Sequence, residues 1–240
     1  MAHPLLAVLL AAANGVFPDP DGRAELLPPL EDGSTVVLAL TAHSLVATHL
    51  TRADLADVPF DGYGGTVSPR TLLRLADGGS MGVHDVVLVA HGQGGNGTGS
   101  GPGLPATSRW DDHPRVRYAR SMRHDVVVHG DERGFVTLGT GVAGRRELSI
   151  EVVTGLRGTG AGRALLGAAL GAVPHGAPAF AVVSPGNARS LRAFLSQGFV
   201  PIGSEVLITR PGRPDPSQDR GIEAYDVDGD DVQRDDVAQD

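Results

Sequence analysis

The sequence predicts an α/β fold in which a mixed, mostly antiparallel central sheet is flanked by helices. Three runs alternate polar and apolar residues with the period of two typical of strands, and turns separate them: 116–129, 135–139 and 147–153. Residues 161–173 and 187–197 instead space their apolar side chains at helical intervals, and the strand-like run 179–184 lies between them. A meander followed by helix, strand and helix is typical of a sheet with helices packed against it.

The first half of the chain predicts further helices and strands. Apolar residues 5–13 predict a helix, because no positive charge precedes them as in a signal peptide and the run is too short to span a bilayer. Residues 35–40 and 45–49 predict a hairpin. Residues 69–77 predict a short helix and residues 83–90 a buried strand.

Composition divides the chain into four regions. Residues 105–210 form the expected core, 96–104 a Gly-rich linker, and 211–240 an acidic tail too poor in aromatic residues to order itself. Residues 1–95 form an N-terminal α/β region. Its element order fits either of two arrangements: the rest of one enlarged domain with the core, or a degenerate second copy of it.

Charge and residue usage exclude several functions. The chain has no cysteine, and all 20 of its basic residues are arginine, which excludes disulfides, thiolate metal sites, a Walker A lysine and Schiff-base chemistry. From residue 211 onward there are 10 acidic and 3 basic residues, so −7 of the net charge of −8 belongs to the tail. The remainder offers no basic field, and we expect a cytoplasmic protein with no nucleic-acid or membrane partner.

The glycine-rich turn of residues 157–162 predicts an anion site. It lies between a strand and a helix, and the N–H groups at the start of a helix point toward one place where the helix dipole favours negative charge. Gly158, Gly160 and Gly162 lack side chains and let a phosphate approach the backbone.

Two motifs in order resemble the GNAT (Gcn5-related N-acetyltransferase) superfamily. Arg157-Gly-Thr-Gly-Ala-Gly162 matches the family's pyrophosphate loop, Arg/Gln-x-x-Gly-x-Gly/Ala. Asn187-x-x-Ser-x-x-x-Phe-x-x-x-Gly-Phe199 resembles the family's Asn-x-x-Ala/Ser-x-x-x-Tyr-x-x-x-Gly-Phe helix. The resemblance implies a GNAT-like sheet and acetyl-CoA as co-substrate. A structural strand, turn and helix without a ligand is the competing interpretation.

The resemblance also implies roles for individual residues. The strand before the loop would pair its backbone with the pantetheine arm, the loop would hold the pyrophosphate mainly through amides, and an asparagine would contact pantetheine or the acceptor. The residues expected to bind the cofactor are therefore Val152, Val153, Arg157, Gly158, Thr159, Gly160, Ala161, Gly162, Arg163 and Asn187.

Direct attack of an amine on a thioester needs a base or a water relay to remove the amine's proton. By the period of two, Glu147 and Glu151 lie on one face of their strand, the face that in the family looks into the acceptor pocket. Glu151 and then Glu147 are the predicted catalytic bases. Surface-exposed or arginine-paired carboxylates are the alternative, since Arg145 and Arg146 are adjacent.

The sequence departs from the family pattern at Phe194, where many members carry a tyrosine that protonates the departing thiolate. Tyr118, expected on a core strand, is a substitute to weigh against a packed core tyrosine. The thiol of coenzyme A is acidic enough for solvent to supply the proton.

Other motifs fail on context. Residues 139–144 have the dinucleotide-binding spacing, but a strand follows where a helix is required. Residues 78–82 match a nucleophile elbow, but a helix precedes Ser80 and a strand follows it, the reverse of the required order. No histidine pair has the spacing of a metal site, so we expect no metal.

The predicted function is that of an N-acetyltransferase, an acyltransferase that moves acetyl from acetyl-CoA to an amine in a ternary complex. The acceptor is left open between a small molecule and a peptide, as is assembly into a homodimer. The alternative is a catalytically silent CoA-binding or regulatory module.

Overall fold

A computed structural model describes residues 2–94, 104–213 and 215. The expected linker 96–104, apart from residue 104, and most of the expected tail 211–240 lie outside the described residues. The strands are β1 (Ala24–Leu27), β2 (Thr35–Leu40), β3 (His43–Ala47), β4 (Ser80–Met81), β5 (Asp85–His91), β6 (His124–Asp131), β7 (Gly134–Thr140), β8 (Arg146–Val152), β9 (Pro178–Val183) and β10 (Val200–Thr209). The helices are α1 (Pro4–Ala13), α2 (Pro69–Ala76), α3 (Pro114–Met122), α4 (Ala161–Ala172) and α5 (Ala188–Leu195), with short 3-10 turns η1 (Gly65–Val67), η2 (Val142–Gly144) and η3 (Thr154–Leu156).

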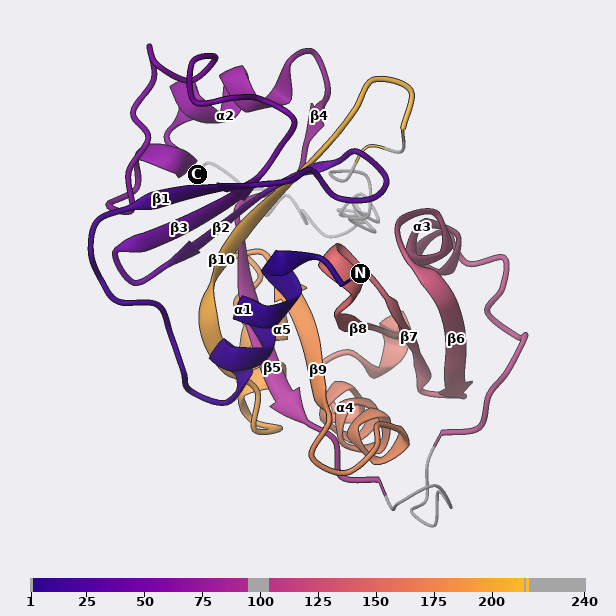
Figure 1. Cartoon of the computed structure of the whole chain (residues 1–240). Coiled ribbons are helices and arrows are strands. Elements are labelled where there is room, and N and C mark those ends of the chain that lie inside the picture. Colours follow the sequence, from indigo (N-terminus) through magenta and orange to yellow (C-terminus); the bar gives the residue numbers. More distant parts are fainter. Residues whose placement is uncertain (1, 95–103, 214, 216–240) are drawn as a thin grey trace, which may run out of the picture.

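The strands of the described residues form one mixed sheet in the order β1-β3-β2-β10-β5-β9-β8-β7-β6, with β4 added to β10. Only β1 with β3 and β8 with β9 pair in parallel, and the other recorded pairs are antiparallel. Figure 1 shows β1–β3 at one end of the sheet and the β6–β8 meander at the other. The α/β fold class predicted from the sequence, mixed and mostly antiparallel with flanking helices, is the one observed.

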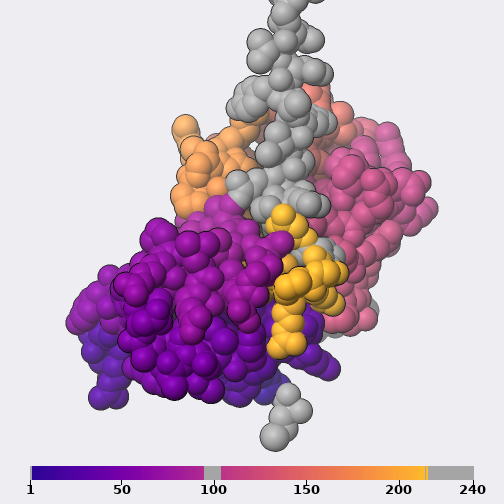
Figure 2. Space-filling view, turned by 90° about the horizontal axis from the view of Figure 1, so that it is seen from above, coloured from indigo at the N-terminus to yellow at the C-terminus, as the bar shows by residue number. Residues whose placement is uncertain are grey.

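Strand β5 joins the two halves of the chain. It lies between β9 and β10 and is antiparallel to both, so a strand from the N-terminal region completes the centre of the sheet. Its Val87, Leu88 and Val89 are fully buried, as expected for an apolar run covered on both faces. Figure 2 shows the halves side by side, with the C-terminal strand region between them.

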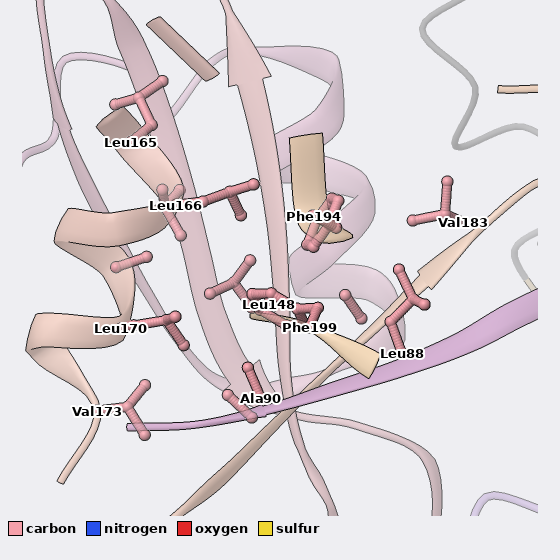
Figure 3. Packing of buried hydrophobic residues seen from close by; sticks show 14 of the residues in the cluster. Leu88, Ala90, Leu148, Leu165, Leu166, Leu170, Val173, Val183, Phe194 and Phe199 are labelled. Atoms are coloured by element: carbon pink, nitrogen blue, oxygen red, sulfur yellow. The ribbon is translucent and has the colours of Figure 1, made fainter. Parts of the chain in front are cut away.

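Helices cover both faces of the sheet. On one face α1 packs with Leu5 and Leu9 against β5, β9 and β10, and this cluster includes Phe180. On the other face α4 and α5 cover β5, β8 and β9. Figure 3 shows Leu166 and Leu170 of α4 turned toward Leu148 of the sheet. Each fully buried leucine contributes about 2 kcal/mol, so α4 is fixed mainly by packing.

Residues 116–129 were expected to form a strand, and this prediction is wrong for their first part. They begin within α3, which runs from Pro114 to Met122, and β6 begins only at His124. Pro114 at the first helical turn and the His113 ring, which accepts the Arg115 N–H, start the helix. Val116 and Ala119, three residues apart, are its buried positions, and this is helical spacing, because residues three apart lie on opposite faces of a strand.

Candidate active site

The gap between β8 and β9 is the centre of the candidate site. β8 pairs with β7 along its whole length, from Arg146 to Val152. Its parallel pairing with β9, in contrast, is a single residue pair, Glu147 with Phe180. Within the described chain, therefore, the edge of β8 that faces β9 has no recorded strand partner beyond Glu147. Those backbone groups are available to an extended ligand.

Alternation of the backbone decides which amide faces this gap. The Val153 N–H donates to Arg133 O at 3.0 Å, on the β7 side. Successive N–H groups of a strand point to opposite edges, so the Val152 N–H points toward β9. Of the two valines expected to bind the cofactor, Val152 presents its N–H to the gap, while that of Val153 is engaged elsewhere.

The glycine turn leads from η3 into α4 at one end of this gap. Gly158 has φ of 86° and Gly160, the N-cap of α4, has φ of 95°, a region that side chains rarely adopt. A Cβ at either position would meet nothing within 4 Å, so it is backbone conformation that calls for glycine. Thr159 Oγ1 donates to Leu156 O at 2.8 Å and fixes the turn.

The start of α4 presents the N–H groups expected of an anion site. The N–H groups of Ala161, Gly162 and Arg163 belong to its first turn, which has no acceptors within the helix. Gly162 also permits a close approach of helix and strand, since a Cβ there would lie 3.4 Å from Val152 Cγ2. Helix and strand therefore bring the glycine turn next to the open edge of β8.

A cavity of about 200 Å³ crosses this gap from one face of the sheet to the other. Residues of both faces of β8 line it, with Glu147 and Ser149 on one and Leu148 and Ile150 on the other. The remaining lining residues come from α3, α5, β5, β9, β10, η2 and the segments that adjoin them: Gly82, Val83, Asp85, Arg115, Tyr118, Met122, Arg123, Val142, Val182, Val183, Ser184, Asn187, Ser190, Phe194, Glu205 and Leu207.

Glu147 is held by arginines deep in the wall of the cavity. Its Oε1 accepts from Arg145 Nε at 2.9 Å and from the Val142 N–H at 3.0 Å, and its Oε2 accepts from Arg123 Nε at 2.8 Å. Burial alone would raise the pKa of the Glu147 carboxyl, but the charges of Arg145 and Arg123 outweigh burial and lower it to about 2. A carboxylate so acidic and so fully bonded is a weak proton acceptor at neutral pH.

Arg145 connects Glu147 to the other half of the sheet. It is 1% exposed, donates through Nη1 and Nη2 to both oxygens of Glu205 at 2.6 and 2.7 Å, and lies over the Phe180 ring. Burial opposes its charged form, but Glu205 and Glu147 together raise its pKa above the usual value. Arg145 and Glu205 are 60 residues apart in the sequence, and no local pattern could have paired them.

Glu151 is the more accessible of the two predicted bases. It is half-buried, and its Oε2 accepts from Arg115 Nε of α3 at 2.8 Å while its Oε1 accepts from Arg157 Nη2 at 3.1 Å. The predicted shared face is confirmed in register, since Phe135, Thr137 and Gly139 of β7 oppose Glu151, Ser149 and Glu147. The arginine pairing that the sequence left as an alternative is present at both carboxylates.

The second motif lies on the opposite wall. Asn187 is the N-cap of α5, where its Oδ1 accepts the Ser190 N–H at 3.0 Å, and it lines the cavity. Phe194 is 4% exposed, and its ring packs edge-on against Phe199 at a centroid distance of 4.9 Å. Phe194 thus provides an apolar wall where a tyrosine would provide a hydroxyl.

Two cavity residues are placed by the tertiary structure in ways the sequence did not indicate. Tyr118 lies on α3, not on a strand as expected, and it lines the cavity from there. The Ser149 hydroxyl lies 2.6 Å from Thr137 Oγ1, and Arg123 Nη1 donates to the Thr137 hydroxyl at 3.3 Å and to that of Ser149 at 3.5 Å. A polar chain therefore runs along β8 from Glu147 to Ser149.

The described residues contain neither a metal-binding cluster nor a membrane-spanning helix. No set of three His, Cys, Asp or Glu side chains arranged to hold a metal ion occurs among the described residues. In the same part of the chain, no helix has the length and apolar character needed to cross a bilayer.

No family model and no curated protein matches this sequence. Solved structures align with it, and two of them carry the name of the GNAT family of acetyltransferases. The first is from Colwellia psychrerythraea and is 12% identical, with a TM-score of 0.36. The alignment covers 60% of this chain and 62% of the neighbour's chain. The second is from Novosphingobium aromaticivorans and is 16% identical, with a TM-score of 0.35. The alignment covers 54% of this chain and 63% of the neighbour's chain.

This chain thus spans less than two thirds of the length of either neighbour. Both neighbours are named as members of the family whose sequence patterns residues 157–162 and 187–199 resemble. Because both TM-scores lie below 0.5, the function of this chain is argued below from its own geometry.

Proposed function

We propose that this chain is an acyl-CoA-dependent N-acyltransferase that moves acetyl from acetyl-CoA to an amine. The observation that carries the proposal is a cavity lined from both faces of β8, where β8 and its parallel neighbour β9 pair at one position only. The start of α4 lies against the same strand, since a Cβ at Gly162 would lie 3.4 Å from Val152 Cγ2. A donor with a phosphate end and an extended arm fits from one face. An acceptor can then reach the thioester from the other.

The donor would lie along the open edge of β8. Its pyrophosphate accepts hydrogen bonds from the N–H groups of Gly158 and of Gly160 to Arg163, where the α4 dipole favours negative charge. The Thr159 N–H does not take part, because it donates to Leu156 O at 3.3 Å. Its pantetheine arm pairs with the β8 edge like an added strand, through Val152 among others. Asn187 on α5 lies on the opposite wall of the cavity and would bound the arm or the acceptor.

The reaction is direct transfer in a ternary complex. The amine nitrogen attacks the thioester carbonyl carbon, the new C–N bond forms, the C–S bond breaks, and the CoA thiolate leaves with the electron pair. The amine must lose one proton, and the thiolate takes up one. Holding both reactants in one cavity removes most of the entropic cost of their encounter.

Glu151 is the better of the two bases in this proposal. Glu147, with a pKa of about 2 and three hydrogen bonds to its carboxylate, is better suited to shaping the cavity. Glu151 is held by two arginines at the protein surface and can take the proton directly or through water. For the departing thiolate, the phenol of Tyr118 or solvent replaces the hydroxyl missing at Phe194.

The test follows CoA release from acetyl-CoA with a thiol reagent, over a panel of polyamines, amino acids, aminoglycosides and peptides with free N-termini. The chain has no cysteine and no lysine, so it contributes no thiol signal and no side-chain amine that could be acetylated. We expect turnover with at least one amine and its loss, by at least about tenfold, in Glu151→Gln. Absence of acetyl-CoA binding at millimolar concentration in calorimetry would refute the proposal.

A catalytically silent CoA-binding module is the second candidate. It is favoured by one observation, that both carboxylates of the predicted pair accept hydrogen bonds from arginines while the expected acid is a buried phenylalanine. Acetyl-CoA binding without CoA release over the whole amine panel supports it. Turnover that is lost in Glu151→Gln eliminates it.

A further inference from the structure

Arg157 connects the glycine turn to Glu151, which lies on the face of β8 that is turned away from α4. Its Nη2 donates to Glu151 Oε1 at 3.1 Å, and its side chain is about a third exposed. The other carboxylate oxygen of Glu151 accepts from Arg115 of α3. Glu151 therefore lies between two arginines, one from the helix on the acceptor side and one from the donor loop.

A pyrophosphate bound in this turn would compete with Glu151 for Arg157. Arginine binds phosphate oxygens through the same planar donors that it offers a carboxylate, and a pyrophosphate brings at least two negative charges. A partly exposed ion pair contributes little to stability, because water and salt screen it, so the exchange costs little. The Arg115 contact, on the other side of Glu151, is not affected by it.

We propose that Arg157 is a positioning residue that reports donor binding to the acceptor side of the site. This inference rests on the proposed function. When CoA binds, Arg157 turns from Glu151 Oε1 to the phosphates, and that oxygen becomes available to the proton of the incoming amine. With the donor absent, Arg157 occupies this oxygen.

Glu147 offers no comparable exchange. The side chains of its arginine partners are buried and lie away from the glycine turn. Arg123 caps the end of α3, and Arg145 lies in the turn before β8. A phosphate at the start of α4 would leave these bonds in place. Donor binding therefore acts on one of the two carboxylates and not on the other.

A double-mutant cycle on CoA affinity, measured by titration calorimetry with free CoA, tests the competition. Glu151→Gln is expected to bind CoA about 2- to 5-fold more tightly, because Arg157 no longer has to leave a carboxylate. Arg157→Gln should bind more weakly. In the Arg157→Gln background, adding Glu151→Gln should change affinity by less than about 1.5-fold.

The controls separate competition from simple charge removal. Glu132→Gln removes an exposed carboxylate from the β6–β7 turn and should leave CoA affinity within about 1.5-fold of the parent. Glu132 precedes Arg133, whose carbonyl accepts the Val153 N–H. If Glu151→Gln does not fold, Glu151→Asp takes its place, since its shorter side chain withdraws the carboxylate from Arg157.

Each outcome of the cycle decides the question. Equal tightening by Glu151→Gln with and without Arg157, or no tightening at all, overturns the inference while CoA binding by the parent protein leaves the proposed function standing. Failure of the parent protein to bind CoA overturns both. Coupling between the two positions, absent in the Glu132→Gln control, supports the inference.

Discussion

The two glutamates of β8 occupy the same face of one strand and differ in nearly everything else. Glu147 is 6% exposed and belongs to a buried network with Arg123, Arg145 and Glu205 that ties the meander to β10. Glu151 is half-buried and accepts hydrogen bonds from Arg115 of α3 and from Arg157 of the glycine turn. The difference teaches that strand periodicity places carboxylates on a face, while depth and partners decide what they can do.

The largest effect is expected at the buried end. Arg145→Met leaves two buried carboxylates, Glu147 and Glu205, without their shared cation and should lower the free energy of unfolding by about 3–5 kcal/mol. Urea denaturation measures it. The adjacent Arg146 is exposed, and Arg146→Met should stay within about 0.5 kcal/mol of the parent. A cost below about 1 kcal/mol for Arg145→Met would contradict the structural role given to this network.

The pH dependence of stability should also come from the buried end. The pKa of Glu147 is lowered in the fold from 4.5 to about 2, so its stabilising effect is complete above about 4.5 and is lost as pH falls toward 2. Between pH 5 and pH 3 the parent should lose on the order of 2 kcal/mol through this group. Urea midpoints at pH 5, 4 and 3 measure the slope.

Glu147→Gln should be less stable than the parent at neutral pH and should show a shallower loss on acidification. Glu31→Gln, at an exposed position, is the matched control and should keep the slope of the parent. Identical slopes for Glu147→Gln and the parent would show that Glu147 carries no such linkage.

At the open end, the expected effect is on binding. Gly160→Val places a β-branched side chain where φ is 95° and where phosphate would approach the backbone, and it should weaken CoA binding by about 10- to 100-fold. Gly176→Val is the matched control, because Gly176 has φ of 73° and a Cβ there would also meet nothing within 4 Å. Gly176 lies beyond the C-terminal end of α4, away from the glycine turn. Calorimetry with CoA compares them, and equal losses would mean that strain alone weakens binding.

The smallest effect is expected at the wall of α5. Asn187→Ala removes the side chain that caps the helix and should cost about 1 kcal/mol of stability. Asn187→Asp keeps an acceptor for the Ser190 N–H and should retain the stability of the parent. Thermal unfolding separates the two. If CoA affinity falls in Asn187→Asp while stability does not, Asn187 also contacts the donor, as the resemblance implied.

Much of the site could be predicted from local sequence. The glycine turn, the start of α4 and the Asn187 cap depend on backbone geometry within a few residues, and local sequence records such requirements directly. The register that puts Glu147 and Glu151 on one face follows from strand periodicity alone. Their cofactor and catalytic roles stay predictions.

Two local interpretations failed or fell short for the same reason. Residues 116–122 alternate well enough to suggest a strand, but Pro114 and the packing of Val116 against Val128 and Phe135 of the meander favour a helix. The hairpin of β2 and β3 was expected, but not that β5 from the same region would lie between β9 and β10. Short segments fit two periods, and tertiary packing decides between them.

By itself, then, the sequence determined the mixed, mostly antiparallel sheet, the glycine turn at the start of a helix and the pair of carboxylates on one strand. The tertiary structure alone decided that Arg145 reaches Glu205, that α3 faces the site with Arg115, Arg123 and Tyr118, and that Arg157 holds Glu151. The physical reason is range. Backbone conformation and periodicity act over a few residues, whereas ion pairs and cavity walls join residues that only the folded chain brings together.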